Sequence, residues 1–592
     1  MKEANLLMWL GREGLDPSAP SLLADDGWVI SRRNLSQAVH ATMVHLRRKG
    51  ISPEHRLALV MPPGPGLATS LLGAMAVTAV APLVPANPVG VMVEDLQRLR
   101  ITHVLVDGSP PPPLLEAAAQ LGLPVLRLDP FALPDPGEDP VDPPSASQLA
   151  LLLQTSGTTS RPKVVPLSHA NLWASAHSVA EVLALGPGDR SLAAMPLFHI
   201  HGIVASLLAP LLAGGSVICC QSNAPDRLLA AMESLQPTWL SAVPTLLQGL
   251  LAELDRRPPA PPAHRLRLLR SSSSPLPPPV LERLELAFGV PVIEAYGMTE
   301  AAHQICSNRL PGSGSGRQPG SVGAAAGPEV AVLGPDRQPR PAGESGEVAI
   351  RGDNVTAGYE AAQDSGWVRD PTGATWFLTG DEGVLDHQGR LTLTGRLKEM
   401  INRGGEKVIP RRVDEALLRH PAVEQALAFA VPHPTLGEDL AAAVVLRVGT
   451  DADEQELRGH VFSELAPHEV PSRILLLEAL PRGATGKLQR IGLAERLGAR
   501  LFPADEPVSG ELEHLIAQTF ATVLQQPQPG RNANFFLLGG DSLSGQRVVN
   551  ALERQLALEL NPALLFAFPS ARSLAAELDQ RLDQALKALE AT

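Results

Sequence analysis

Lysine, cysteine, basic charge and long apolar runs are all scarce in this chain of 592 residues. The three cysteines, Cys219, Cys220 and Cys306, are too few for a disulfide framework and lack metal-ligand spacing, which favours a reducing compartment. The formal net charge of −13 argues against a nucleic-acid partner, because such partners require basic patches. The amino terminus lacks the apolar core of a signal peptide. We therefore expect a cytoplasmic protein.

The stretch from Gly202 to Cys220 is apolar enough to imitate a membrane span. Pro210 and the Gly214-Gly215 pair interrupt it, and both residue types break helices. We predict a buried helix followed by a strand, and no membrane partner.

Only seven lysines occur, whereas arginine is abundant. Where arginine is the default cation, a retained lysine indicates a need for the compact ammonium group. Codon usage also produces an arginine excess, so this scarcity supports other arguments and does not stand alone. Four of the lysines fall inside the motifs described below: Lys163, Lys398, Lys407 and Lys487.

The apolar pattern changes three times along the chain. Short apolar runs alternate with helical stretches from Arg56 to about Glu294, which predicts an α/β domain with a parallel sheet. From Gly323, Gly-Pro turns separate alternating strands, which predicts a β-rich third section of the same domain. Near Arg396 a smaller α+β subdomain begins, and an all-α four-helix bundle follows a linker.

The predicted boundaries follow from these changes in composition. We predict residues 1–395 as the large N-terminal subdomain, 396–500 as the C-terminal subdomain, 501–510 as the linker and 511–592 as the helical bundle. The helices of the bundle are predicted near Glu511–Leu524, Ser542–Glu559 and Ser570–Leu589.

A segment rich in Ser, Thr and Gly follows an apolar strand at Gln154 and ends at Lys163. Small residues and hydroxyls let a backbone wrap a polyphosphate, and a lysine supplies charge. The segment is not a Walker loop, because Pro162 stands where the second glycine belongs and Val164 where the magnesium-binding Ser/Thr belongs. By itself the segment fits either a phosphate loop or an ordinary polar surface loop.

The run TSGTTSRPK resembles the phosphate-loop signature of the adenylate-forming superfamily, which includes acyl-CoA synthetases and the adenylation domains of nonribosomal peptide synthetases. Further signatures of that superfamily follow in the expected order over about residues 1–500. They are PLFHIHG, EAYGMTE, GESGEVAIRG, FLTGD, GRLKEMINRGGEKV and PRGATGK. The ordered set is far more specific than any one motif.

The resemblance assigns roles to the matching residues. Two anions must meet when a carboxylate attacks the α-phosphate of ATP, so positive charge and Mg²⁺ are needed. Thr299 is expected at the α-phosphate, Glu300 at Mg²⁺ and Tyr296 on the adenine. Asp381 is expected to accept the ribose hydroxyls, and Arg396 to bridge ribose and phosphate. The β- and γ-phosphates are assigned to Thr155, Ser156, Gly157, Thr158, Thr159 and the closing Lys163.

The resemblance also implies a moving C-terminal subdomain. Lys487 is expected to reach the carboxylate and the bridging oxygen as charge builds. Lys398 is the expected pivot between adenylation and thioester formation. Gly404 and Gly405 are expected to line the tunnel for the thiol, where missing side chains leave room.

The segment around Ser542, NFFLLGGDSL, resembles the attachment motif of peptidyl and acyl carrier domains. Ser542 is expected to begin a helix, whose N-terminus favours an attached phosphodiester. The alternative is that Ser542 is only a helix cap. The implied partners are a small-molecule carboxylic acid, a phosphopantetheinyl transferase and a downstream assembly-line or tailoring enzyme.

The acid is less well defined by the sequence. The region Phe198–Leu208 lacks the aspartate by which the amino-acid-activating branch pairs an α-ammonium. The stretch Arg270–Asn308 resembles oxalate-CoA ligases, except that Gly297 replaces an alanine and so leaves the pocket larger or differently shaped. The residues expected around the acid are His199, Val243, Ser274, Gly297 and His303, with Ser271 to Ser274 as further polar groups.

We therefore expect ATP-dependent activation of a small carboxylic acid without a free α-amino group, followed by transfer to a phosphopantetheine arm on Ser542. Three alternatives stay open at this point. They are an amino-acid-loading didomain of a nonribosomal peptide pathway, an acyl-CoA ligase with a vestigial carrier, and a non-catalytic carrier scaffold.

Overall fold

The computed structural model describes residues 14–85, 87–135, 142–155, 162–257, 263–312, 317–360, 366–433, 436–481, 488–501, 506–540, 542–556, 558, 560–561 and 564–590. The chain forms two compact units, and the boundary between them falls inside strand β20, between Leu393 and Thr394. All six tryptophans lie in the larger unit.

The larger unit contains two mostly parallel sheets. The first has the strand order β6-β5-β3-β4-β7-β8, and only β8 runs antiparallel to its neighbour. Its strands are β3 (Arg56–Val60), β4 (Ala79–Pro82), β5 (His103–Val106), β6 (Val125–Arg127), β7 (Leu149–Thr155) and β8 (Lys163–Ser168). The strand–helix alternation predicted from the sequence is confirmed here.

The second sheet has the order β15-β14-β13-β12-β11-β9-β10-β1-β2. Strands β9 to β13, with β1, are parallel to their neighbours, whereas β2, β14 and β15 are antiparallel. The bounds are β1 (Pro20–Ala24), β2 (Val29–Ser31), β9 (Arg190–Ala193), β10 (Ser216–Cys219), β11 (Trp239–Ala242), β12 (Leu268–Ser271), β13 (Val292–Met298), β14 (His303–Ser307) and β15 (Ala324–Ala325).

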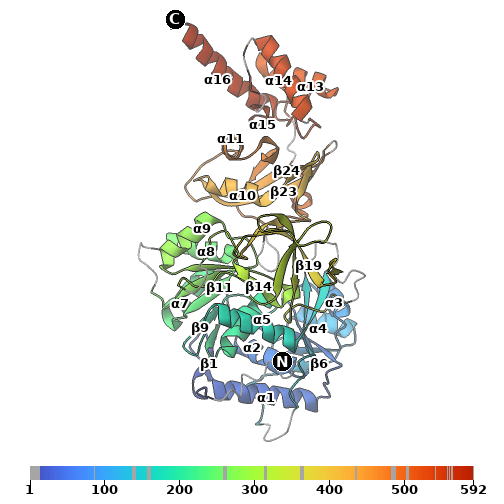
Figure 1. Cartoon of the computed structure of the whole chain (residues 1–592), viewed down its shortest axis with the longest axis vertical. Helices are drawn as coiled ribbons and strands as arrows, with labels where there is room; N and C mark the ends of the chain where they lie inside the picture. Colours follow the sequence, from blue (N-terminus) through green and yellow to red (C-terminus); the bar gives the residue numbers. More distant parts are fainter. Residues whose placement is uncertain are drawn as a thin grey trace. The chain divides into compact units, whose positions relative to one another are not determined.

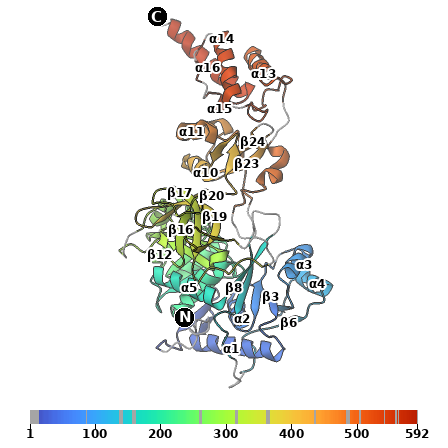
Figure 2. The same cartoon turned by 45° about the vertical axis from the view of Figure 1, so that its right-hand side comes forward.

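Helices cover both faces of these sheets, which explains why their strands are apolar throughout. Helices α1 (Arg32–Arg48), α2 (Pro65–Met75) and α5 (His169–Val182) share one hydrophobic core with residues of both sheets. Helices α3 (Val89–Arg98) and α4 (Pro112–Gln120) pack on the other face of the first sheet (Figure 2). Helices α7 (Pro225–Leu235), α8 (Pro244–Asp255) and α9 (Pro278–Phe288) pack on the other face of the second (Figure 1).

The apolar stretch from Gly202 to Cys220 forms a buried helix and then strand β10, as the sequence predicts. Its first part is π-helical (η1, His201–Leu208), and α6 (Ala209–Leu212) continues it. A Cβ atom on Gly202 would lie 2.3 Å from the carbonyl oxygen of Pro196. Glycine is therefore required for η1 to lie against the segment before it.

A third, antiparallel sheet completes the larger unit, in the order β16-β17-β19-β18 with β20 paired to β19. Its strands are β16 (Glu329–Leu333), β17 (Ser345–Arg351), β18 (Trp367–Arg369), β19 (Thr375–Leu385) and β20 (Leu391–Arg396). The β-rich section predicted from the alternating pattern is thus confirmed. A short 3-10 turn, η2 (Thr299–Ala301), links β13 to β14.

The smaller unit begins with an α+β part. Its sheet has the order β22-β21-β24-β23, with β25 parallel to β24. The bounds are β21 (Ile401–Arg403), β22 (Glu406–Val408), α10 (Pro410–Arg419), β23 (Val423–His433), β24 (Gly437–Leu446), α11 (Glu454–Glu464), η3 (Pro467–Glu469), β25 (Arg473–Leu476), α12 (Leu493–Leu497) and η4 (Gly498–Arg500).

A helical part follows in the same unit, with α13 (Glu511–Leu524), α14 (Ser542–Leu556), α15 (Leu564–Ala567) and α16 (Ala571–Glu590). Figures 1 and 2 show these helices grouped together near the C-terminus. Their shared core includes Phe520, Phe535, Leu552 and Leu565. The predicted all-α bundle is confirmed.

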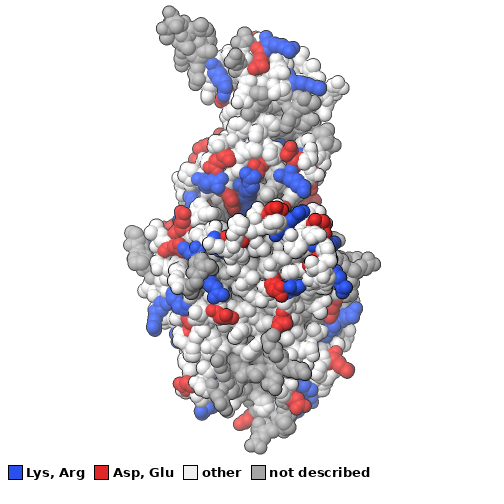
Figure 3. Space-filling model, viewed as in Figure 1, with Lys and Arg blue, Asp and Glu red and all other residues white. Residues whose placement is uncertain are grey.

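Charged side chains of both signs are interspersed over the face of the molecule in Figure 3. The excess of acidic residues is therefore not gathered into one patch among the described residues of that face. None of the described helices is long and apolar enough to cross a membrane.

Candidate active site

The hydroxyl groups of both tyrosines of the chain donate hydrogen bonds to buried carboxylates in the larger unit. The hydroxyl of Tyr296, on β13, donates to Oδ2 of Asp381 on β19 over 2.5 Å. The hydroxyl of Tyr359 donates to Oε1 of Glu300 in η2 over 2.7 Å. The structure therefore pairs Tyr296 with Asp381, which the sequence assigns to the adenine and the ribose, and pairs Glu300, assigned to Mg²⁺, with Tyr359.

Lys163 lies beside the same group. Its ammonium is 4.2 Å from the ring centroid of Tyr359, whose hydroxyl in turn contacts Glu300. Lys163 opens β8 and pairs across the hairpin with Thr155, the last residue of β7. The two ends of the predicted phosphate loop therefore lie near the predicted magnesium ligand.

Hydrogen bonds to the backbone hold the segments that carry the two carboxylates. The amide of Thr356 donates to the carbonyl of Glu300 over 2.7 Å, which ties η2 to the loop that carries Tyr359. The amide of Asp381 donates to the hydroxyl of Thr379 over 3.2 Å, and that hydroxyl donates to the carbonyl of Val348 over 2.8 Å. Glu300 is thus held in the turn between β13 and β14, and Asp381 within strand β19.

The chemistry of these side chains fits ATP with Mg²⁺. A buried carboxylate offers the oxygen ligand that Mg²⁺ prefers, and a lysine ammonium is a common partner of phosphate oxygens. Asp381 can accept two donors at once, as two ribose hydroxyls require. Burial raises the pKa of nearby Glu347, and the charge of Asp381 adds to this shift.

A second polar cluster surrounds Arg270 at the end of β12. The guanidinium is fully buried, and burial lowers its pKa to about 9. It donates to Oγ of Ser241 over 2.9 Å, to Nε2 of His303 over 3.0 Å and to Oε1 of Gln304 over 2.6 Å. None of these partners is a carboxylate, and Arg270 forms no ion pair among the described residues.

Two imidazole rings complete the cluster. His201 and His303 stack with centroids 4.7 Å apart and an angle of 21° between the rings. The nitrogens of His201 lie 2.7 Å from Oγ of Ser241 and 3.1 Å from Oγ of Ser273. Because Nε2 of His303 faces a guanidinium donor, it is the unprotonated nitrogen of a neutral ring.

Several donors of the cluster have no hydrogen-bond partner among the described residues. They are Nε of Arg270, Nε2 of Gln304 and the hydroxyls of Ser271 and Ser272. A buried donor without a partner costs about 1–3 kcal/mol. An anion or an acceptor-rich group bound here would satisfy these donors and compensate the buried charge.

Gly297 gives the cluster its shape and does not enlarge it. A Cβ atom at this position would lie 1.7 Å from the carbonyl oxygen of His303. His303 has a φ of +94°, and the β13–β14 pairing shifts register next to Gly297. The backbone of His303 therefore fills the space that a side chain on Gly297 would take, so the pocket is differently shaped and not larger.

The other predicted pocket residues lie apart from the polar contacts of Arg270. Val243 caps α8 and belongs to the hydrophobic core beside the second sheet. The hydroxyl of Ser274 donates to the carbonyl of Ser273 over 2.8 Å. His199 is half-buried, with its ring against Phe198 at 4.7 Å between centroids.

Five residues of the site were missed from the sequence: His201, Ser241, Arg270, Gln304 and Tyr359. His201 stands in the same PLFHIHG motif as His199, so the motif signalled the segment but not which histidine joins the cluster. Arg270 directly precedes the four serines that were predicted as polar groups of the pocket, and an arginine at that position has no signal of its own. Ser241 and Tyr359 carry no local sequence signal.

An apolar cavity of about 280 Å³ lies elsewhere in the larger unit. Its walls include Leu59, Leu83, Phe198 and Val217, and they contain none of Arg270, His201 and His303. The residues that line it include no charged side chain.

The remaining predicted residues belong to the smaller unit or lie outside the described residues. Arg396 and Lys398 are exposed at the end of β20 and in the turn after it. Gly404 and Gly405 form the turn between β21 and β22 with φ values of +61° and +98°. Helix α14 begins at Ser542, whose side chain is not among the described ones. Ser156, Gly157, Thr158, Thr159 and Lys487 lie outside the described residues.

The fold, together with the two buried carboxylates that each pair with a tyrosine, defines an ATP-dependent, acid-activating enzyme. Residues 15–360 match the family described as AMP-binding enzyme, and residues 412–487 match its C-terminal domain. Residues 514–578 match the phosphopantetheine attachment site. The chain belongs to the AMP-binding enzyme family, which confirms the resemblance drawn from the ordered motifs.

Named relatives point the same way. The chain is 42% identical over 404 residues to an oxalate–CoA ligase of Arabidopsis thaliana, covering 67% of this chain and 75% of the relative. It is 36% identical over 497 residues to a sulfoacetate–CoA ligase of Cupriavidus necator, covering 81% and 94%. ATP-bound MatB from Rhodopseudomonas palustris superposes with a TM-score of 0.74 at 28% identity, covering 84% of this chain and 99% of that one.

These findings establish an ATP-dependent acid–thiol ligase that uses ATP and Mg²⁺. They also establish a carrier-type region whose cofactor is 4′-phosphopantetheine bound covalently to a serine.

Proposed function

We propose that this chain activates a small carboxylic acid without a free α-amino group as its acyl-adenylate, and then transfers the acyl group to a phosphopantetheine thiol on Ser542. The observation that carries the choice of acid is the buried guanidinium of Arg270, which has no carboxylate partner among the described residues.

A buried cation selects against an α-amino acid. An α-ammonium placed beside Arg270 would be repelled, and the repulsion is strong because burial lowers the local dielectric. The segment Phe198–Leu208 offers no carboxylate to offset it. Amino-acid loading is therefore disfavoured by charge as well as by the missing aspartate.

The same charge favours an acid with a second anionic or acceptor-rich group. The unpartnered donors around Arg270 would bind that group, while the reacting carboxylate points to the nucleotide. Two relatives are named for acids of this kind, oxalate and sulfoacetate. Neither name is carried over as the substrate, because Gly297 and the backbone of His303 give this pocket its own shape.

In the proposed nucleotide site, each of the residues described above would bind a different part of ATP or Mg²⁺. Glu300 would hold Mg²⁺, with Lys163 and Thr155 to Thr159 on the β- and γ-phosphates and Thr299 at the α-phosphate. Tyr296 and Asp381 would hold the adenosine, and Arg396 the ribose and phosphate. Lys487 would offset the charge on the reacting carboxylate. When bound, ATP with Mg²⁺ supplies an electrophilic phosphorus and a pyrophosphate leaving group.

Thioester formation needs a second arrangement of the chain. We place the pivot at Lys398, in the exposed turn just after the boundary between the two units. The Gly404-Gly405 turn would admit the thiol, because it carries no side chains there. Ser542, as first residue of α14, would present the arm at a helix N-terminus, which favours its phosphodiester.

The partners follow from this chemistry. A phosphopantetheinyl transferase must attach the arm, and a downstream assembly-line or tailoring enzyme must take the acyl group from the carrier. We propose residues 396–500 as the mobile subdomain, 501–510 as the linker and 511–592 as the carrier domain.

A screen of pyrophosphate release across carboxylic acids tests the choice of substrate. We expect turnover with small acids that carry a second anionic group, and at least about tenfold lower kcat/KM for α-amino acids of equal size, in line with roughly 1.4 kcal/mol for an unpaired charge. A strong preference for one α-amino acid would overturn the proposal in favour of a peptide-synthetase didomain.

Intact-protein mass spectrometry tests the acceptor. After treatment with a transferase, ATP and the acid, the parent and the Ser544→Ala control should gain the arm and then the acyl group. Ser542→Ala should gain neither, with pyrophosphate release unchanged. CoA-ester formation equal in parent and Ser542→Ala, without protein loading, would favour the CoA ligase that the relatives' names describe. If the parent neither released pyrophosphate nor gained an acyl group with any acid, a non-catalytic carrier scaffold would be favoured.

A further inference from the structure

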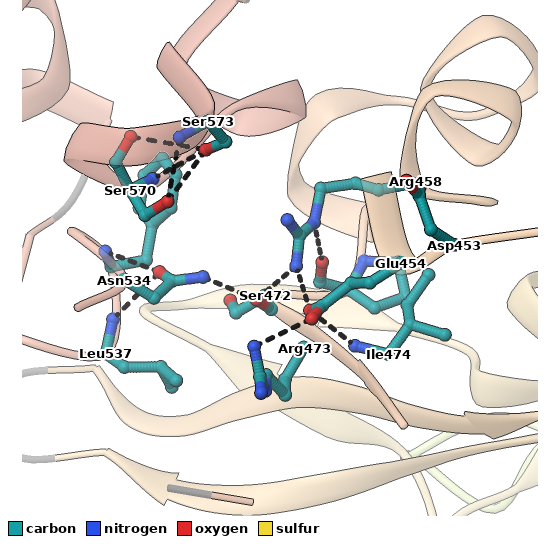
Figure 4. Close-up of polar contacts among 12 residues, drawn as sticks. Asp453, Glu454, Arg458, Ser472, Arg473, Ile474, Asn534, Leu537, Ser570 and Ser573 are labelled. Carbon is teal, nitrogen blue, oxygen red and sulfur yellow. Dashed lines mark hydrogen bonds and ion pairs between the residues drawn. The ribbon is translucent and has the colours of Figure 1, made fainter. Parts of the chain in front are cut away.

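The loop that leads to Ser542 lies against the α+β part of the same unit. Nδ2 of Asn534 donates to the carbonyl of Ser472 over 2.5 Å, as Figure 4 shows. Oδ1 of the same side chain accepts from the amides of Phe536 and Leu537, over 2.9 and 3.3 Å. The side-chain oxygen of Asn534 therefore stabilises the shape of the loop, and its side-chain nitrogen binds the loop to the subdomain.

Ser472 is a rigid anchor. Its carbonyl also accepts from Nη2 of Arg458 over 2.6 Å, and Arg458 is buried and bound to Glu454 over 2.7 Å. Glu454 in turn accepts from Nη1 of Arg473 over 2.7 Å and from the amide of Ile474 over 2.9 Å (Figure 4). This network holds the start of β25 through contacts that do not involve the carrier.

The carrier side of the contact is equally fixed. Asn534 forms an isolated antiparallel bridge with Ser570, and the amide of Phe535 donates to the carbonyl of Pro569 over 2.7 Å. Ser570 accepts from the amide of Ser573 at the start of α16 over 3.2 Å. The loop therefore meets Ser472 as part of the helical bundle, not as a loose connection.

Phe536 extends the contact to the thiol-tunnel turn. His433 accepts the amide of Leu436 at Nδ1 over 3.0 Å, so Nε2 carries the proton and donates to the carbonyl of Phe536. The guanidinium of Arg403 lies 5.7 Å from the Phe536 ring centroid. Arg403 pairs with Asp439 over 2.7 Å and directly precedes Gly404.

Apolar packing accompanies these polar contacts. Leu537 packs against the hydrophobic cluster on the subdomain sheet that includes Phe429, Val431 and Leu475. The side chains of four polar residues are buried, each at most 8% exposed: Asn534, Arg403, His433 and Ser472. Buried, mutually satisfied polar groups specify one arrangement, because any other leaves them without partners.

We propose that the loop Asn534–Leu538 and the surface around Arg403, His433 and Ser472 form a docking interface through which the carrier and the C-terminal subdomain move as one rigid body. The partner that this subdomain surface fits is the chain's own carrier. The loop lies a few residues before Ser542, and the surface adjoins the Gly404-Gly405 turn, so one movement of the subdomain would bring the turn and the arm into place together. The functional part of this inference rests on the proposed loading of Ser542.

Distance measurement by pulsed electron paramagnetic resonance tests the interface in the full-length protein. Spin labels go on Val448→Cys, which is 95% exposed in the subdomain, and on Gln555→Cys, which is exposed on α14. The native cysteines are buried or half-buried, and burial raises the pKa of Cys220 to about 12, so the new thiols label selectively. We expect one narrow distance distribution, unchanged by ATP and acid.

Asn534→Asp is the matched variant, because it keeps the acceptor that shapes the loop but removes the donor to Ser472. It should broaden the distribution, as should His433→Ala from the other side of the interface. Asn550→Asp, on the exposed face of α14, makes the same chemical change away from the interface and should leave the distribution narrow.

Kinetics complete the test. Asn534→Asp should slow single-turnover loading about tenfold, the loss expected for one hydrogen bond of roughly 1.4 kcal/mol, with pyrophosphate release unchanged. A broad distribution in the parent, a narrow one in Asn534→Asp, or faster loading in that variant would overturn the inference. The distances need no arm on Ser542, so failure of the loading proposal would be seen separately in the mass spectrum.

Discussion

At the scale of single residues, Arg270 sets the charge of the proposed acid site. Gln304→Glu would place a carboxylate where Oε1 of Gln304 now accepts from the guanidinium at 2.6 Å. The buried charge would then be compensated inside the protein. We expect kcat/KM for acids with a second anionic group to fall by about 10- to 100-fold, the range of 1.5–3 kcal/mol for a hydrogen bond to a charged group. A monocarboxylic acid of equal size is the control, and equal losses for both acids would contradict the assignment.

The two tyrosines allow a paired test of the nucleotide site. Tyr359→Phe removes the donor to Glu300, and Tyr296→Phe removes the donor to Asp381. We expect the first to change the Mg²⁺ concentration needed for half-maximal pyrophosphate release by several-fold, and the second to change KM for ATP by several-fold, since each hydrogen bond contributes about 0.5–1.5 kcal/mol. Each variant is the control for the other. Identical effects of both on Mg²⁺ and ATP would contradict the separate roles.

His169 links the stability of the larger unit to pH. Its ring is buried, Nε2 donates to the carbonyl of Met75 over 3.0 Å, and burial lowers its pKa to about 4. Its reference pKa is 6.5. The stabilisation by the neutral ring is therefore complete above about pH 6.5 and is lost as the pH falls toward 4, by at most about 1.4 kcal/mol per pH unit.

His169→Asn tests this linkage, because the amide does not titrate. The variant should be less stable than the parent at pH 7.5, and its deficit should shrink as the pH falls from 6.5 to 4.5. Urea unfolding followed by tryptophan fluorescence reports the larger unit alone, since all six tryptophans lie there. A deficit that is constant across this range would contradict the lowered pKa.

At the scale of elements, the π-helical segment η1 places His201 in the polar cluster around Arg270. Gly202→Ala would put a methyl group 2.3 Å from the carbonyl oxygen of Pro196, so η1 must shift and carry His201 with it. We expect a stability loss of about 1–3 kcal/mol and a fall in kcat/KM for the acid. The measurements are the urea midpoint and pyrophosphate release.

Gly66→Ala is the matched control for this element. Gly66 lies in helix α2, and a Cβ atom there would meet nothing within 4 Å. The substitution should be neutral or raise stability by about 0.5–1 kcal/mol, because alanine favours helices. If both substitutions behaved alike, close packing of η1 would not be the reason for the glycine.

At the scale of the whole molecule, two half-reactions should depend on different lysines. Lys487→Ala should lower pyrophosphate release by about 100-fold or more, the size of loss seen when one electrostatic stabiliser of a transition state is removed. It should still allow loading from acyl-adenylate made beforehand. Lys398→Pro, at the proposed pivot, should spare activation and slow loading. Single-turnover assays of each step measure this, and equal losses in both steps for both variants would contradict a moving subdomain.

The elements were largely predictable because local patterns specify them. The helix Glu511–Leu524 was predicted with the bounds that the structure gives it, and the helix at Ser542 with the same first residue. The strand–helix alternation of the first sheet follows from apolar runs that are buried on both faces. The π-helical form of η1 was not predictable, because it depends on how closely Gly202 approaches Pro196.

The sequence by itself determined the family and the order of the motifs, and it predicted the residues proposed for the nucleotide site apart from Tyr359, because each motif is a short continuous segment with its chemistry in adjacent positions. Only the tertiary structure showed the polar cluster around Arg270 and the carrier contact. Arg270, His201, Ser241 and His303 come from separate elements, and Asn534 and Ser472 lie 62 positions apart. Whether such residues meet is set by strand register, by backbone such as that of His303 at a φ of +94°, and by packing, none of which a local pattern records.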